Sequence, residues 1–234
     1  MQNTHSIHHR FGGTFALIGA GLGIAALVVL GQAIGWPGIL REPPSIVFPR
    51  IDANRTAMLL GYSFYLLSSL AMIPVAFALR ERFVAAGINT AVADSVTFFG
   101  AAGAILKTLG IVRWLSAMPL LATQYAAATT PEARSTFEVA YLSLNGYAGS
   151  VGELLGVQLV SGIWMASVSI LLLRHLQMVW IALLGGAAGF GFLIVTGRIF
   201  FPSIAALQKL INPIALLWVV ALGVLMLRRD SSKN

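Results

Sequence analysis

Four ionisable side chains interrupt the long apolar stretches of the sequence: Asp94, Lys107, Arg113 and Glu153. A charged side chain at membrane depth is costly, so each is a candidate for function. At a rise of about 1.5 Å per helical residue, Lys107 lies roughly 20 Å along a helix that starts at Asp94, and Arg113 lies near its far end. Glu153 precedes Arg174, where its apolar run ends, by 21 residues. We therefore expect Lys107, Arg113 and Glu153 to share one level near one face of a membrane.

Two cations and one carboxylate at the same level predict a polar pocket that opens outward. In this pocket Lys107 or Arg113 would bind an anionic headgroup or substrate, with Glu153 as their partner. The residues slightly favour a structural alternative, in which Glu153 only pairs with a cation inside the bundle and Arg113 extends toward the headgroups. An interfacial helix that precedes Glu153 would cover the pocket. The complete set of residues expected to line it is Lys107, Arg113, Asn145, Glu153 and Glu138.

The remaining residue types give little support for catalysis or for a bound metal or cofactor. The chain has no cysteine, which excludes disulfides and thiolate ligands. Its histidines are placed for neither a haem nor a zinc site. No nucleophile-elbow or nucleotide-binding motif occurs. A lone carboxylate between two cations is held ionised and makes a poor proton donor, so the sequence leans away from an enzyme. The histidines are His5, His8, His9 and His175.

Composition fixes the fold class. Of the 234 residues, 58% are hydrophobic and 10% are charged, whereas soluble domains carry about 25% charged residues. The net charge of +7 comes from basic residues scattered at the ends of apolar runs, a pattern of lipid-headgroup contacts rather than of nucleic-acid binding. The sequence predicts an all-α, polytopic membrane bundle forming one domain. Its six transmembrane helices are expected at about 12–34, 56–79, 94–115, 147–173, 176–197 and 212–227.

The first apolar run is too long for the apolar region of a signal peptide, so it is interpreted as a retained helix.

The connections between the spans can also be predicted. Four prolines within residues 35–55 predict a loop rather than a helix. Pro119 is expected to end or kink the third span and leave residues 120–128 along the membrane surface. An amphipathic, interfacial helix is expected over 131–144, with a break or bend at Asn145 and Gly146.

Small residues recur on two spans and predict close helix packing. Gly149, Gly152 and Gly156 fall on one face of the fourth span, and Gly185 and Gly189 fall on one face of the fifth. Such stripes let two helices approach closely. A less favoured alternative is a broken transport helix near residues 146–152.

Six spans place both termini on the same side of the membrane. Basic residues flank the spans directly on the side of the termini, whereas those on the other side are diluted by proline and acidic residues. The positive-inside rule then weakly favours cytoplasmic termini in the inner membrane of a bacterium. Asp94 is predicted to be an ordinary acid at a helix start, where the helix dipole favours it.

Four short stretches carry a resemblance to a known family. They are residues 110–115 (GIVRWL), 118–122 (MPLLA), 144–149 (LNGYAG) and 152–156 (GELLG). They resemble a family of small bacterial membrane proteins known only as a domain of unknown function, the 4386 group. The likeness extends over roughly residues 10–227, with its specific part at about 107–164. It implies a six-helix membrane protein, places Arg113, Asn145 and Glu153 in the family's signature, and supplies no catalytic role.

Three functions are compatible with these observations. The first is binding or transport of a lipid or a small anionic molecule in the outward-facing pocket, with membrane lipids as the expected partners. The second is a regulatory or scaffold subunit that contacts another membrane protein through its helix faces. The third is a lipid-modifying membrane enzyme with Glu153 as its acid or base. Nucleic acid is not an expected partner.

Overall fold

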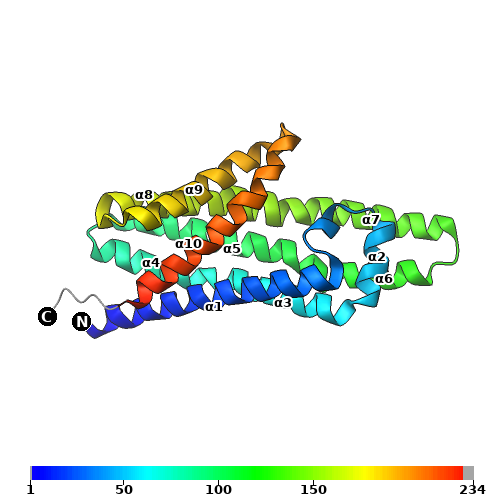
Figure 1. The fold of residues 1–234 in the computed structure, drawn as a ribbon, viewed down its shortest axis with the longest axis horizontal. Coiled ribbons are helices and arrows are strands. Elements are labelled where there is room, and N and C mark those ends of the chain that lie inside the picture. The colour runs from blue at the N-terminus through cyan, green and yellow to red at the C-terminus, as the bar shows by residue number, and fades with distance from the viewer. Residues whose placement is uncertain (1, 229–234) are drawn as a thin grey trace.

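The computed structural model describes residues 2–228, and it describes side chains from Arg10 onward. Within these residues the protein is helical and contains no strand (Figure 1). The expected all-α fold with six transmembrane helices is thereby confirmed. The six stretches that are long and apolar enough to cross a membrane are Arg10–Ile34, Arg55–Ala85, Thr90–Ala127, Pro131–Leu176, Val179–Ile199 and Pro202–Leu227.

Local breaks divide several of these stretches into separate elements. Between α3 and α4, for example, Pro74 has no N–H to donate to the carbonyl of Leu70, and the helix is interrupted at Ala71. The elements are α1 (Gln2–Ile34), η1 (Gly38–Arg41), α2 (Pro44–Ala53), α3 (Arg55–Leu70), α4 (Met72–Ala85), α5 (Thr90–Leu115), α6 (Ala117–Ala127), α7 (Pro131–Gly149), η2 (Ser150–Val160), α8 (Ser161–Leu176), α9 (Val179–Thr196), η3 (Gly197–Ile199), η4 (Pro202–Leu207) and α10 (Gln208–Leu227).

The helices form a bundle with both termini at one end, which we call the terminal end (Figure 1). Helix α1 contacts α3, α4 and α10, while α5 contacts η2, and α8 contacts α9. Helix α10 crosses the bundle obliquely (Figure 1). Trp164 and Trp218 meet edge to face within one large hydrophobic core. Their 5.4 Å separation between ring centroids is in the range that aromatic pairs favour.

Glycines bring α5 and η2 into backbone contact. A Cβ atom added to Gly110 would lie 2.5 Å from the Cα of Gly152, and one added to Gly156 would lie 2.6 Å from the backbone nitrogen of Lys107. A Cβ atom added to Gly189 of α9 would likewise lie 2.5 Å from the backbone nitrogen of Ala166. The predicted role of these small residues in close helix packing is confirmed.

Helix α7 continues without a break into η2 and α8. The resulting stretch, Pro131–Leu176, has 46 residues, and the α-helical residues of α7 and α8 alone would span about 50 Å, well beyond the roughly 30 Å of a bilayer core. A break at Asn145 and Gly146, one of the two expected outcomes, does not occur. Both residues keep helical geometry because Asn145 is held by a side chain of α5, and Tyr141, one turn earlier, is buried against α2.

The loop predicted for residues 35–55 was also wrong, since most of it is the short η1 and the helix α2. Pro44 occupies the first turn of α2, where a missing N–H leaves no hydrogen bond unmade. Pro49 removes one hydrogen bond farther along, but Phe48 and Ile51 are buried on the same helix. Burial of such side chains stabilises by about 1.5–3 kcal/mol each, enough to offset that loss.

Helices α2, α6 and α7 form a compact unit at the end opposite the termini, which we call the cap (Figure 1). Residues 120–128, expected along the membrane surface, instead form most of α6, which pairs with α7 in a hairpin. Phe48 of α2 packs between Tyr125 of α6 and Tyr141 of α7, with ring centroids 4.8 and 5.3 Å away. The cap therefore has a hydrophobic core of its own.

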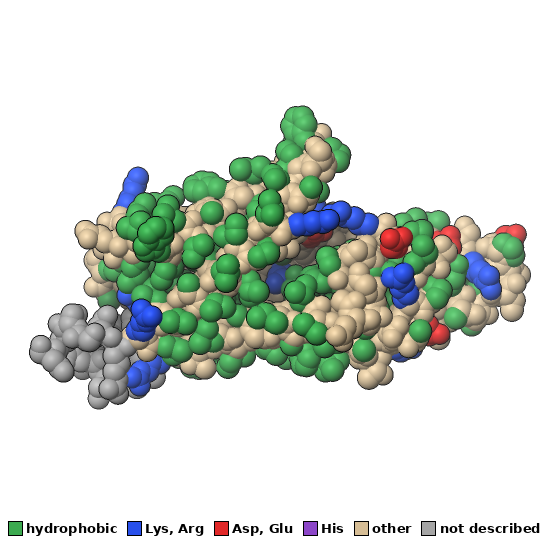
Figure 2. Space-filling view, viewed as in Figure 1, with side chains coloured by type: hydrophobic (Ala, Val, Ile, Leu, Met, Phe, Trp, Pro, Cys, Tyr) green, Lys and Arg blue, Asp and Glu red, His purple; other side chains and the backbone are tan. Residues whose placement is uncertain are grey.

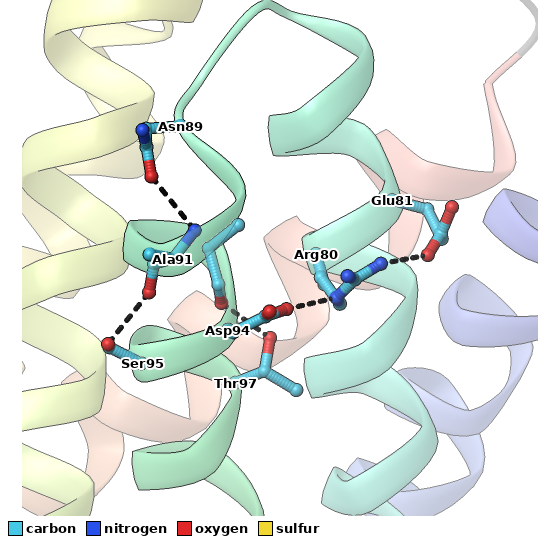
Figure 3. Close-up of polar contacts among 8 residues, drawn as sticks. Arg80, Glu81, Asn89, Ala91, Asp94, Ser95 and Thr97 are labelled. Atoms are coloured by element: carbon cyan, nitrogen blue, oxygen red, sulfur yellow. Dashed lines mark hydrogen bonds and ion pairs between the residues drawn. The ribbon is translucent and has the colours of Figure 1, made fainter.

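Polar contacts fix the opposite end of the bundle (Figure 3). Helix α5 begins at Thr90, four residues before the predicted start, because Asn89 caps it by accepting a hydrogen bond from the backbone of Ala91. Asp94 lies one turn inside α5 and pairs with Arg80, which also pairs with Glu81 at 2.7 Å. Asp94 thus joins α4 to α5 through an ion pair, and it does not lie in the first turn of the helix, where it was predicted.

Candidate functional site

Glu153 and Arg198 form an ion pair between two segments that are distant in the sequence. A guanidinium nitrogen of Arg198, in η3, donates to a carboxylate oxygen of Glu153, in η2, at 3.1 Å. Their side chains are 22% and 39% exposed, respectively. The expectation that Lys107 or Arg113 would pair with Glu153 was therefore wrong. Helix α9 contacts η2 and delivers Arg198 from its end, so the partner comes from the fifth span rather than the third.

The segment that carries Glu153 is π-helical. In η2 the 11 residues Ser150–Val160 follow i→i+5 hydrogen bonding, so successive side chains are turned by a smaller angle than in an α-helix. Ser161 donates to the carbonyl of Gly156 at 2.7 Å, with the same spacing of five residues. Long π-helical stretches are rare and concentrate at functional sites. Within this segment Glu153 faces Arg198 of η3, while Gly152 and Gly156 face α5.

A surface groove with a cavity volume of about 520 Å³ adjoins this ion pair. Its lining contains two arginines and no carboxylate, and Arg41 forms no ion pair among the described residues. Figure 2 shows blue Lys and Arg side chains beside an acidic one at a hollow in the middle of that face, with another basic group at its bottom. The lining residues are Arg41, Ser150, Leu154, Arg198, Ile199, Pro202 and Ala205.

Lys107 lies close to the level of Glu153 along the bundle. The backbone of Lys107 is next to Gly156, less than one π-helical turn beyond Glu153. Its ammonium lies 4.3 Å from the centre of the Tyr65 ring, and it makes no ion pair with any described carboxylate. The predicted common level of Lys107 and Glu153 is thus present, although the two do not pair.

Arg113 and Asn145 contact each other directly. The Nε of Arg113 donates to the side-chain oxygen of Asn145 at 3.2 Å, and another guanidinium nitrogen donates to the carbonyl of Gly110. The guanidinium also lies 5.5 Å from the ring centre of Trp114, within the range of a cation–π contact. The structure therefore joins these two predicted residues, with neutral acceptors in place of the expected carboxylate.

Glu138 lies apart from the other predicted site residues. It accepts a hydrogen bond from the hydroxyl of Tyr125 at 3.2 Å inside the cap hairpin. Along the continuous helix it precedes Glu153 by 15 residues, which is about 22 Å. Of the five predicted residues, Glu153 borders the groove, Lys107 lies at its level, Arg113 and Asn145 form a separate pair, and Glu138 belongs to the cap.

Sequence reasoning missed Arg41 and Arg198, the two basic residues of the groove. Both were assigned to loops outside the spans, where basic residues commonly contact headgroups. A signal was nevertheless available for Arg198, because it directly follows the fifth apolar run and must therefore lie at the same membrane face as Glu153. No comparable signal existed for Arg41, whose position depends on the fold of residues 35–55.

A family model described as a domain of unknown function (DUF4386) matches residues 11–229, nearly the whole chain. The chain belongs to the DUF4386 family. No curated protein and no solved structure matches it. Among the described side chains of this DUF4386 protein, no group of three or more His, Cys, Asp or Glu residues could hold a metal ion. The side chains of His5, His8 and His9 lie outside the described residues. The protein is thus a multi-pass membrane protein of a family without an assigned activity.

Proposed function

We propose that this DUF4386 protein binds an anionic lipid, with the headgroup in the groove beside Arg41 and Arg198. The observation that supports this proposal most strongly is the excess of positive charge in and beside the groove. Arg41, Arg198 and Lys107 supply three positive charges, and Glu153 is the carboxylate that offsets one of them. Uncompensated cations at a partly desolvated site attract an anion strongly. Binding of a phosphate-bearing headgroup would offset a further positive charge.

The chemistry of the two arginines suits a phosphate group. A guanidinium presents several N–H donors in a fixed plane and binds phosphate oxygens in a bidentate manner. Arg198 is already oriented by Glu153, which limits the entropy lost when a ligand binds. Arg41 is exposed and can move toward a headgroup. The pair could therefore hold one phosphate between η1 and η3.

The apolar part of the lining favours a lipid over a small soluble anion. Leu154, Ile199 and Pro202 line the groove together with the arginines. Phe200 and Phe201, which follow Ile199, are exposed. A site with charged donors on one side and exposed apolar surface on the other matches an amphiphile, whose acyl chains would contact the apolar part.

The position of the glycine stripes supports binding rather than a scaffold role. Gly152 and Gly156 face α5, and Gly185 and Gly189 contact residues of α8 and α10 within the bundle. These stripes are therefore used inside the protein and do not form an outward face for a partner helix. With cytoplasmic termini in a bacterial inner membrane, the cap and the groove would face the periplasmic side.

Native mass spectrometry of the gently extracted protein tests this proposal. Arg41→Gln and Arg198→Gln are each compared with Arg174→Gln, a matched change of an exposed arginine in the last turn of α8, outside the groove lining. We expect the unaltered protein and Arg174→Gln to retain a bound anionic phospholipid that both groove variants lose. Equal retention of lipid by all four proteins would contradict the proposal.

A further inference from the structure

Two buried tyrosine hydroxyls lack hydrogen-bond partners near the base of the cap. Tyr62 of α3 is 2% exposed and Tyr141 of α7 is 1% exposed. Neither hydroxyl has a hydrogen-bond partner in the structure. Buried polar groups in folded proteins are nearly always hydrogen-bonded, because an unpaired donor loses its hydration without replacement. Two such donors in one core indicate that something other than protein satisfies them.

Both hydroxyls belong to side chains that surround Arg113. The ring of Tyr62 stacks on Trp114 with a 5.0 Å centroid separation, and the guanidinium of Arg113 lies over the same Trp114 ring. Tyr141 belongs to the same core and precedes Asn145, which holds Arg113, by one helical turn. Trp114, which the guanidinium of Arg113 contacts, belongs to the same hydrophobic core as Tyr62 and Tyr141. The two donors and the guanidinium thus form one cluster.

This cluster carries an unbalanced positive charge. The hydrogen bonds of Arg113 go to the neutral oxygens of Asn145 and Gly110, and no described carboxylate forms an ion pair with it. The carboxylate of Glu153 pairs with Arg198 instead. A half-buried cation without a counterion is unfavourable, since little water remains to solvate it. The cluster lacks an acceptor that carries negative charge.

We propose that the hydroxyls of Tyr62 and Tyr141 and the guanidinium of Arg113 bind a small monovalent anion, a halide or a carboxylate. Such an anion accepts a hydrogen bond from each hydroxyl and balances the single charge of Arg113. A water molecule would satisfy the hydroxyls but leave the charge, and a divalent oxyanion would overcompensate it. The site uses none of the groove arginines, so it is independent of the proposed lipid site.

Thermal unfolding of the full chain in detergent tests this inference. Sodium chloride, bromide and acetate are titrated against sodium gluconate, a much bulkier monovalent anion, at constant ionic strength. We expect each small anion to raise the melting temperature by a few degrees in a saturable manner, because a ligand that binds only the folded state stabilises it. Tyr62→Phe and Tyr141→Phe should each weaken the apparent affinity about tenfold, through loss of one hydrogen bond to a charged group.

The phenylalanine variants also separate this inference from a purely structural role. In gluconate they should unfold at or above the temperature of the unaltered protein, because they remove hydroxyls that have no protein partner. Tyr125→Phe is the control, since its hydroxyl bonds to Glu138 in another part of the cap. Anion effects that are absent, or that are the same size in every variant, would overturn the inference. Lipid binding by Tyr62→Phe should be unchanged, which distinguishes failure here from failure of the proposed function.

Discussion

Glu153 and Arg198 are 45 positions apart in the sequence and meet at 3.1 Å. Their contact joins the π-helical segment η2 to the turn after α9 and fixes one wall of the groove. Because both side chains remain partly exposed, the pair is a modest source of stability, on the order of 0–1 kcal/mol. Its main consequence is to hold Arg198 beside the groove in a defined orientation.

Replacement of the Glu153 carboxylate tests how its negative charge affects lipid binding in the groove. Glu153→Gln should lower the free energy of unfolding by no more than about 1 kcal/mol, as expected for a partly exposed ion pair. The same change should increase affinity for anionic lipid, because Arg198 loses its internal counterion. Chemical denaturation and lipid titration measure the two effects. A variant that folds normally but binds anionic lipid more weakly would show that Glu153 contributes through orientation rather than charge.

Lys107 offers a second test, because its replacement should weaken lipid binding without lowering the stability of the protein. Lys107→Met removes an ammonium that has no described carboxylate partner, so stability should be unchanged or slightly higher. Affinity for anionic lipid should fall severalfold because one positive charge near the ligand is lost. The matched control is Lys209→Met, which alters an exposed lysine of α10. Equal binding by both variants would place the ligand away from Lys107.

The glycine contact between α5 and η2 predicts a large effect from one added methyl group. In Gly152→Ala the new Cβ would lie 2.8 Å from the Cα of Gly110, so backbone must shift. We expect a loss of about 1–3 kcal/mol in the free energy of unfolding, as in other overpacked sites. Gly146→Ala is the control, because nothing lies within 4 Å of a Cβ there. That control should be neutral or stabilised by up to about 1 kcal/mol, through the higher helix propensity of alanine.

Loss of an aromatic side chain from the core of the cap should destabilise the cap more than the rest of the bundle. Phe48 is 1% exposed between two tyrosine rings, so Phe48→Ala should destabilise the cap by about 3–5 kcal/mol. Hydrogen exchange should then accelerate in α2 and α6 while α8 and α9 stay protected. Val139→Ala, at a side chain 60% exposed on α7, should have little effect. Uniform acceleration over all helices would mean that the cap and the bundle unfold together.

The fold could be predicted from the sequence because a lipid environment places a simple requirement on every transmembrane span. Every span needs about 20 apolar residues, and each backbone group must be bonded within a helix. Six charge-free or nearly charge-free runs therefore correspond to six membrane-length helices. The break at Pro74 and the glycine contacts of α5 with η2 also depend on local rules of backbone chemistry and size, which a single sequence displays.

Parts of the structure that depend on contacts between distant segments could not be predicted. Asn145 followed by glycine is a typical break, yet the helix continues because Arg113 and the cap core support it. Pro49 likewise argued against a helix, but burial of Phe48 outweighs it. The pairing of Glu153 with Arg198 requires both the π-helical pitch of η2 and the path of α9. Counting residues along an ideal α-helix predicts neither the π-helical pitch of η2 nor the path of α9.

Photocrosslinking tests the central claim, a lipid site at the groove, most directly. A phosphatidylglycerol that carries a diazirine in its headgroup is incorporated with the full chain into nanodiscs and activated by light, and the adducts are mapped by peptide mass spectrometry. A lipid site at the groove predicts adducts concentrated in peptides that contain Arg41, residues 150–154 and residues 198–205. These adducts should be suppressed by unlabelled phosphatidylglycerol and diminished in Arg198→Gln. Adducts spread evenly around both ends of the bundle, or unaffected by Arg198→Gln, would contradict it.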